Sequence, residues 1–282
     1  MSRIDEQLAR SRTRIAAAEA RLLLAHALGR SHAWLVAHGD EAMSAEESGR
    51  FAGLVSRRAQ GEPIAHLVGS REFYGRSFSV TREVLIPRPE TELLVELALA
   101  KLHGDRENAA PAILDLGAGS GCLGITLALE IPAARVTAAD LSSAALDLAR
   151  SNARALAAPL HLVESDWYSA LGYERFDLVV ANPPYIAESD PHLGQGDLRF
   201  EPALALTSGA DGLTAIRRIV ARAPHHLEPG GWLMLEHGYD QAEAVAALLR
   251  AAGLVDIEQR RDLAGILRVS AGRFGDSLGD KA

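Results

Sequence analysis

From residue 111 onward, segments with the pattern of a β-strand alternate with segments with the pattern of an α-helix. Short apolar runs predict strands at 112–116, 135–139, 160–163, 176–181, 232–236, 255–258 and 266–269. Helical patterns separate most of these runs, at 122–130, 142–156, 212–227 and 241–252. Strands joined through helices pair in parallel, with helices on both faces of the sheet. The pattern predicts an α/β fold with a doubly wound, seven-stranded, mostly parallel sheet, whose last strands are candidates for antiparallel pairing.

The residues before this region have the pattern of short amphipathic helices. Apolar residues recur at intervals of three and four over 14–28, and Gly29 is placed to end that helix. A short second helix follows, and Ser44 with Glu47 has the spacing of a capping box at the start of a third. We therefore predict a small helical bundle at 1–68. It is either a structural cap or a surface that binds a partner protein.

A linker is predicted between the bundle and the sheet, at 69–87. Two short aromatic-containing runs flank Gly75 and indicate a β-hairpin. The sheet domain then occupies 88–282. At its start Arg88 lies between two prolines that stiffen the backbone around it. Proline and acidic residues such as Glu90 are also typical of a helix start, which explains them without any function.

The composition argues against several classes of protein. No uncharged apolar run of the 282-residue chain reaches the roughly 18 residues that span a bilayer, and the first residues lack an apolar signal core. A single cysteine, Cys122, permits no internal disulfide and suits a reducing cytoplasm. The net charge of −8 counts against a nucleic-acid partner. His225, His226 and His237 lack metal-ligand spacing, so no metal is expected.

The predicted strand 176–181 ends at Asn182-Pro183-Pro184-Tyr185. Proline lacks the N–H that a sheet ladder needs, so these residues project from the carboxyl end of the strand, where open α/β sheets bind ligands. An Asn amide, a stiffened carbonyl and an aromatic face would together bind a planar N–H group, such as an amide or an exocyclic amine. Alone, the same four residues also fit a strand-ending turn with an exposed Tyr.

Three neighbouring strand ends carry residues suited to a nucleoside ligand. The turn after the first strand is glycine-rich, but Cys122 stands where a dinucleotide fingerprint has its third glycine. Asp115 would repel a pyrophosphate and attract a cation, which favours S-adenosylmethionine over NAD. Asp140 is placed for a ribose, and Asp166 with Trp167 for an adenine ring. The predicted cofactor site is therefore Asp115, Gly117, Ala118, Gly119, Ser120, Gly121, Asp140, Asp166, Trp167 and Asn182.

In this order the motifs resemble those of class I methyltransferases, which use S-adenosylmethionine and have a Rossmann-like fold. The segments 85–92, 182–186 and 199–206 resemble motifs of one family more closely: the protein-glutamine methyltransferases that modify peptide chain release factors (the HemK/PrmC family). The segment 262–265 also resembles that family. Leu267 departs from it, because the family often has an acid there, before the position of Arg268. The resemblance covers nearly the whole chain.

The resemblance implies an enzyme that methylates the side-chain amide of the Gln in the Gly-Gly-Gln motif of class I release factors. Catalytic roles then fall to Asn182, Pro183 and Tyr185, and substrate binding to these three with Pro184, Arg88 and Glu90. The Asn182 oxygen and the Pro183 carbonyl would accept the two amide N–H groups and direct the nitrogen lone pair. The implied protein is a cytoplasmic monomer that grips the release factor with its N-terminal bundle and contacts neither nucleic acid nor membrane.

Two other functions remain open at this point. The motif at 182–185 is shared with enzymes that methylate amino groups of DNA or RNA bases, although these favour a basic groove. A non-catalytic cofactor-binding protein is the third possibility, and the intact acceptor motif argues against it.

Overall fold

The computed structural model describes residues 2–105 and 110–275. The chain divides into two compact units, one of 1–70 with 192–200 and one of 71–191 with 201–282. This division differs from the predicted ranges 1–68, 69–87 and 88–282 chiefly because 192–200 groups with the first unit. Residues 1, 106–109 and 276–282 of those ranges lie outside the described residues.

The second unit is built on the predicted seven-stranded sheet, with the strand order β5-β4-β3-β6-β7-β9-β8. Its strands are β3 (Ala112–Leu116), β4 (Arg135–Asp140), β5 (His161–Glu164), β6 (Phe176–Ala181), β7 (Leu227–Glu236), β8 (Leu254–Arg261) and β9 (Leu267–Phe274). The five strands from β5 to β7 pair in parallel, and β9 runs antiparallel to both β7 and β8. The mostly parallel sheet with antiparallel strands at the end of the chain is confirmed.

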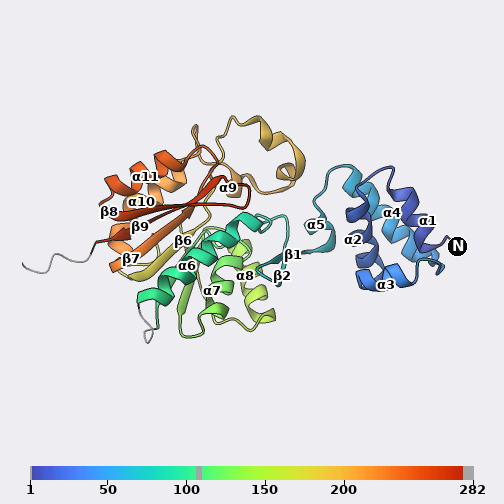
Figure 1. The fold of residues 1–282 in the computed structure, drawn as a ribbon, viewed down its shortest axis with the longest axis horizontal. Helices are drawn as coiled ribbons and strands as arrows, with labels where there is room; N and C mark the ends of the chain where they lie inside the picture. Colours follow the sequence, from blue (N-terminus) through green and yellow to red (C-terminus); the bar gives the residue numbers. More distant parts are fainter. Residues whose placement is uncertain (1, 106–109, 276–282) are drawn as a thin grey trace, which may run out of the picture. The chain divides into compact units, whose positions relative to one another are not determined.

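Helices cover both faces of this sheet (Figure 1). They are α6 (Glu92–Asp105), α7 (Cys122–Glu130) and α8 (Ser143–Ala155) on one face, and α10 (Thr214–His226) and α11 (Ala242–Ala251) on the other. Successive side chains of a strand point to opposite faces. Ile113 of β3 accordingly packs in the core beneath α6 and α7, whereas Leu114 and Leu116 pack with α10 and α11. The doubly wound architecture predicted from the sequence is therefore confirmed.

The order of the strands determines where a ligand crevice forms. From β3 the chain proceeds outward through β4 to β5, and then returns to place β6 on the other side of β3. Such a reversal leaves a crevice outside the carboxyl ends of the two central strands. In this sheet the crevice lies beyond Leu116 of β3 and Ala181 of β6.

The predicted hairpin is formed by β1 (Ser70–Phe73) and β2 (Arg76–Ser79). Its two turn residues, Tyr74 and Gly75, have φ angles of 50° and 71°, as a type I′ turn requires. Phe73 and Phe78 pack edge to face, with ring centroids 6.1 Å apart, in the core beneath α6. The hairpin is therefore anchored on the second unit.

Among the described residues before the hairpin, the first unit has five α-helices where three were predicted. These are α1 (Ile4–Ser11), α2 (Ala17–Leu28), α3 (His32–Ala37), α4 (Ala45–Ala59) and α5 (Ile64–Val68). The αL residue Gly29 caps α2, and the capping box of Ser44 and Glu47 begins α4, as predicted. Sequence periodicity missed α1 because charged residues surround its one fully buried apolar residue, Ile4.

Short helical segments complete the two units: η1 (Pro89–Thr91), η2 (Pro191–Gly194), η3 (Gly196–Phe200) and α9 (Ala203–Leu206). None of the helices in the described part of the chain has the length and apolar character needed to cross a bilayer.

Candidate active site

A cavity of about 440 Å³ lies at the crevice between β3 and β6, in the second unit. Residues that follow four parallel strands line it, together with residues before α6 and around α9. The predicted site residues in its wall are Asp115, Gly117, Ala118, Gly119, Ser120, Asp140, Asp166, Trp167, Asn182, Pro184 and Arg88. The fold thus brings together residues that are up to about a hundred positions apart in sequence.

Asp115 is almost completely buried at the base of the cavity. Its Oδ2 accepts a hydrogen bond from the Gly124 N–H at 2.9 Å, and its Oδ1 has no hydrogen-bond partner among the described residues. Burial raises the pKa of this carboxyl to about 7. A carboxyl oxygen without a partner, on a residue that lines a cavity, is suited to a cationic group of a ligand.

Gly124, in the first turn of α7, was not predicted as part of the site. A Cβ at this position would lie 3.1 Å from Asp115 Oδ2 and 3.4 Å from Asp115 Cβ, a tighter contact than side chains usually make. The absence of a side chain therefore lets Asp115 reach the backbone of the helix.

Asp140 is held by two backbone groups at the end of β4. Its Oδ2 accepts from the Gly119 N–H and its Oδ1 from the Ser142 N–H, each at 2.8 Å. The carboxylate therefore fastens the glycine turn and is itself fixed in orientation. Each oxygen retains acceptor capacity toward a ligand hydroxyl.

Asp166 and Trp167 follow β5 at the rim of the cavity. The exposed Asp166 carboxylate pairs with Arg218 of α10 at 2.6 Å, a cation that the sequence analysis did not identify. Trp167 is half-buried, and its indole edge lies 3.6 Å from the position of a Cβ on Gly117. The aromatic ring therefore lies against the glycine turn, where an adenine platform is expected.

The Asn182 amide belongs to a hydrogen-bonded group that the sequence analysis did not foresee. Its Nδ2 donates to Thr91 Oγ1 at 3.0 Å, and the Thr91 hydroxyl donates to Glu236 Oε2 at 2.6 Å. Asn182 Oδ1 is buried and has no hydrogen-bond partner within residues 2–105 and 110–275. A buried acceptor without a partner in a cavity wall is a place for a ligand N–H.

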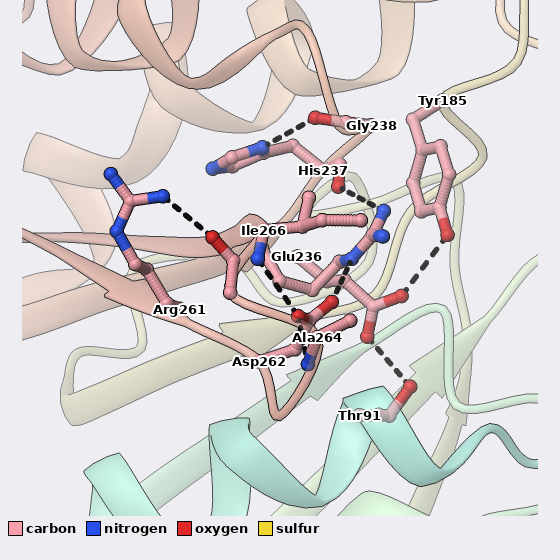
Figure 2. Close-up of polar contacts among 11 residues, drawn as sticks. Thr91, Tyr185, Glu236, His237, Gly238, Arg261, Asp262, Ala264 and Ile266 are labelled. Carbon is pink, nitrogen blue, oxygen red and sulfur yellow. Dashed lines mark hydrogen bonds and ion pairs between the residues drawn. The ribbon is translucent and has the colours of Figure 1, made fainter.

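Tyr185 contacts the same carboxylate from a different direction, as Figure 2 shows. Its hydroxyl donates to Glu236 Oε1 at 3.1 Å, so both oxygens of Glu236 accept a hydroxyl proton. Burial raises the pKa of Glu236 to about 7 and also raises the pKa of the Tyr185 phenol. Neither Tyr185 nor the buried Pro183 is among the residues that line the cavity. Glu236 ends strand β7 as Asp140 ends β4. This position at a strand end is the sequence feature that could have identified Glu236 as a site residue.

The two remaining predicted substrate residues differ in their surroundings. The Arg88 guanidinium pairs with the fully buried Glu201 carboxylate at 2.5 Å, and Glu201 also accepts the Ile86 N–H at 3.3 Å. These contacts join the motif at 85–92 to the motif at 199–206. Glu90 is exposed and does not line the cavity.

The turn between β8 and β9 supports Arg268, whose positive charge acts to lower the pKa of Glu236. Asp262 accepts the N–H groups of Ala264 and Ile266 through Oδ1 and the Arg268 guanidinium through Oδ2, the last at 3.3 Å. Leu267 pairs with Arg261 in the β8–β9 ladder, next to a register shift between Arg260 and Arg261.

No group of three or more His, Cys, Asp or Glu side chains in the described part of the chain could hold a metal ion.

Comparison with known proteins matches a family model to part of each unit. The family model of the PrmC N-terminal domain matches residues 1–69, and that of the methyltransferase small domain matches residues 91–196. The release factor glutamine methyltransferase of Burkholderia pseudomallei is 56% identical over 265 residues, which cover 92% of each chain. The corresponding enzyme of Escherichia coli K12 is 43% identical over 257 residues, 91% of each chain.

Solved structures of lower identity share the fold. The 16S rRNA N2 G1207 methyltransferase of T. thermophilus, solved with AdoMet and guanosine, has a TM-score of 0.54 at 23% identity, over 73% of this chain and 49% of that one. The catalytic domain of hMettl16 has a TM-score of 0.58 at 15% identity, over 81% and 83%. At these identities the likeness extends to the class I methyltransferase fold and no further.

Proposed function

The chain belongs to the family of release factor glutamine methyltransferases, and from this we propose that it transfers a methyl group from S-adenosylmethionine to the side-chain amide nitrogen of a release factor glutamine. The observation that carries the acceptor assignment is the buried Asn182 Oδ1, which has no hydrogen-bond partner among the described residues. By family membership, the glutamine is that of the Gly-Gly-Gln motif of class I release factors.

The cavity residues fit the cofactor. Asp115 Oδ1 provides a buried acceptor without a partner for the cationic ammonium, and the amide groups of the glycine turn suit a carboxylate. Asp140, fixed by two backbone N–H groups, is proposed to accept the ribose hydroxyls, and Trp167 is proposed to provide an aromatic face for adenine. S-adenosylmethionine supplies a methyl group on a sulfonium, which makes that carbon electrophilic.

The contribution of the protein is to present the amide nitrogen as a nucleophile. An amide nitrogen is a weak nucleophile because its lone pair is delocalised into the carbonyl. Asn182 Oδ1 and the Pro183 carbonyl accept its two N–H groups, which orients the lone pair and stabilises positive charge developing on nitrogen. No strong base is required, because the methylated nitrogen becomes acidic and loses its proton through these acceptors.

Other parts of the chain have proposed roles in substrate recognition. Pro184 lies in the cavity wall, and Tyr185 is proposed to pack on the planar amide. Arg88 and Glu90 are proposed to contact the release factor near the cavity, Arg88 while paired with Glu201. The helical domain at 1–68 is proposed to grip the release factor. We expect the enzyme to act as a monomer in the cytoplasm.

The test is methyl transfer from radiolabelled S-adenosylmethionine to three acceptors in parallel. These are a class I release factor, the same factor with its Gly-Gly-Gln glutamine substituted, and DNA or RNA. We expect label only in the unsubstituted factor. Label in nucleic acid would support amino methylation of a base, and label retained by the substituted factor would refute the glutamine assignment.

A further inference from the structure

We propose that Thr91 and Glu236 are positioning residues that hold the Asn182 amide in a single orientation, with its oxygen presented to the acceptor glutamine. The inference rests on the proposed function, because it explains how the amide acceptor is set. It concerns Thr91, which lies in the cavity wall, and Glu236, which does not. The proposed function assigns neither residue a contact with cofactor or substrate, and both act through Asn182.

The direction of each hydrogen bond follows from what each group can donate. A carboxylate only accepts, so the Thr91 hydroxyl, 2.6 Å from Glu236 Oε2, donates its one proton to Glu236. Toward Asn182, at 3.0 Å, the same hydroxyl oxygen can then only accept. Asn182 must therefore turn its NH₂ group toward Thr91 and its oxygen away from it.

This constraint is needed because an Asn side chain has nearly the same shape in its two orientations. In the flipped orientation Oδ1 would face the Thr91 oxygen, two acceptors without a proton between them. The NH₂ group would then face the N–H groups of the substrate amide, which it cannot accept. Satisfying a flipped Asn182 would require Thr91 to withdraw its proton from the buried Glu236, which is costly.

Glu236 itself is fixed by contacts from several elements. Tyr185 donates to its second oxygen, so neither oxygen is free to take another orientation (Figure 2). The charged groups that act on it are Arg268 of β9, which favours the ionised carboxylate, and Glu90 of η1, which opposes it. Protonation of Glu236 would let it donate to Thr91 and free the Thr91 proton for Asn182. Acid is therefore expected to weaken the orientation.

The orientation can be measured without substrate or cofactor. The sequence contains three asparagines, at positions 108, 152 and 182, so [¹⁵N]asparagine labelling gives three side-chain amide pairs. The pair that is missing in Asn182→Ala identifies Asn182. We expect one Nδ2 proton of Asn182 to exchange slowly with solvent in the wild type and to lose this protection in Thr91→Val.

Thr126 provides a matched control for the substitution. It is buried in the same domain, and its hydroxyl has no hydrogen-bond partner among the described residues. Thr126→Val therefore makes the same change of shape without breaking a hydrogen bond. It is expected to leave the exchange of the Asn182 amide and the rate of methyl transfer unchanged.

Kinetics provide the second readout. Thr91→Val is expected to lower kcat on a release factor about a hundredfold while KM and cofactor affinity stay within about twofold, since the substitution misorients an acceptor without removing a binding group. Thr91→Ser keeps the hydroxyl and should restore most of kcat. Glu236→Gln can still accept the Thr91 proton, so its kcat should fall less than that of Thr91→Val. The wild-type kcat is expected to rise with pH between 6 and 8, and Glu236→Gln should lose this rise.

The outcomes separate this inference from the proposed function. Wild-type kcat in Thr91→Val, or an Asn182 amide equally protected in wild type and Thr91→Val, would overturn the positioning role while leaving glutamine methylation intact. If the wild-type enzyme transfers no methyl group to a release factor, the proposed function fails, and amide exchange still decides the orientation. If Thr91→Val does not fold, Thr91→Ser and Glu236→Gln carry the test. An unaltered pH profile in Glu236→Gln would then refute the inference.

Discussion

The protonation of Asp115 should control the binding of S-adenosylmethionine between pH 5.5 and 7. Burial raises the pKa of Asp115 to about 7, and only its ionised form attracts the ammonium group of the cofactor. The ionised fraction is about one half at pH 7 and about one tenth at pH 6, so the apparent Kd should increase about fivefold over this step. The cofactor keeps the same charge in this range, because its α-amino group titrates near 7.7–8.0 and its carboxyl near 3.5.

Isothermal titration calorimetry measures both the affinity and the accompanying proton. At pH 6, titrations in buffers of different ionisation enthalpy should show release of nearly one proton on binding, falling to about half a proton at pH 7. Two variants separate Asp115 from Glu236, a second buried acid of this domain whose pKa burial raises to about 7. Asp115→Asn should bind more weakly and without the pH dependence, whereas Glu236→Gln should retain it, because Glu236 does not line the cavity. A wild-type Kd that changes less than twofold from pH 6 to 7, or a dependence that persists in Asp115→Asn, would refute the reasoning.

Three further predictions concern Asp115, Asn182 and Gly124, the last with a control in the first unit. The folded-state pKa of Asp115 is raised from 3.8 to about 7, so protonation of this carboxyl stabilises the folded state. This contribution to the free energy of unfolding is complete below pH 3.8 and is lost as the pH rises through 7. Without cofactor, Asp115→Asn should therefore increase the free energy of unfolding at pH 8 by up to about 4 kcal/mol, measured by denaturant titration; an unchanged value would contradict this. Asn182→Ala should keep the far-UV circular dichroism spectrum and lower kcat far more than cofactor affinity, and unchanged turnover would remove Asn182 from the mechanism. Gly124→Ala should weaken cofactor binding, because the added methyl group displaces Asp115. The control is Gly53→Ala, at a helical glycine with open space around it, which should leave binding unchanged and stabilise the protein by about 0.5–1 kcal/mol. Equal effects of the two substitutions on binding would argue against the displacement.

The parallel part of the sheet could be predicted because β3, β4 and β7 each contain an apolar run that is followed by a helical pattern. The strand at 176–181 was assigned to its observed residues, Phe176–Ala181, since the following prolines mark its end. The helix α1 was missed because it contributes few apolar residues to its core, and its burial depends on partners that no local pattern identifies. The association of 192–200 with the first unit likewise depends on long-range contacts, such as that of Arg58 with Asp197 at 3.1 Å.

The cavity wall could be predicted where a residue lies at the end of a parallel strand, because neighbouring strand ends meet at one edge of the sheet. Asp115, Asp140 and Asn182 were found in this way, and all three line the cavity. Thr91 could not be found, because a threonine within a helix-start motif has a sufficient local explanation. Its contact with Glu236 joins residues 145 positions apart, and this proximity follows only from the folded chain.

Two of the buried acids of the domain, Asp115 and Glu236, illustrate how similar burial serves different purposes. Asp115 and Glu236 are each about 1% exposed, and burial raises the pKa of both to about 7. Asp115 leaves one oxygen without a partner among the described residues, so its unfavourable burial is relieved when a cation binds. Glu236 accepts a hydroxyl proton at each oxygen and does not line the cavity, so it fixes the groups around it instead of binding a ligand. The difference between a binding acid and an orienting acid therefore lies in the hydrogen bonds that the fold leaves unmade, which neither residue type nor pKa reveals.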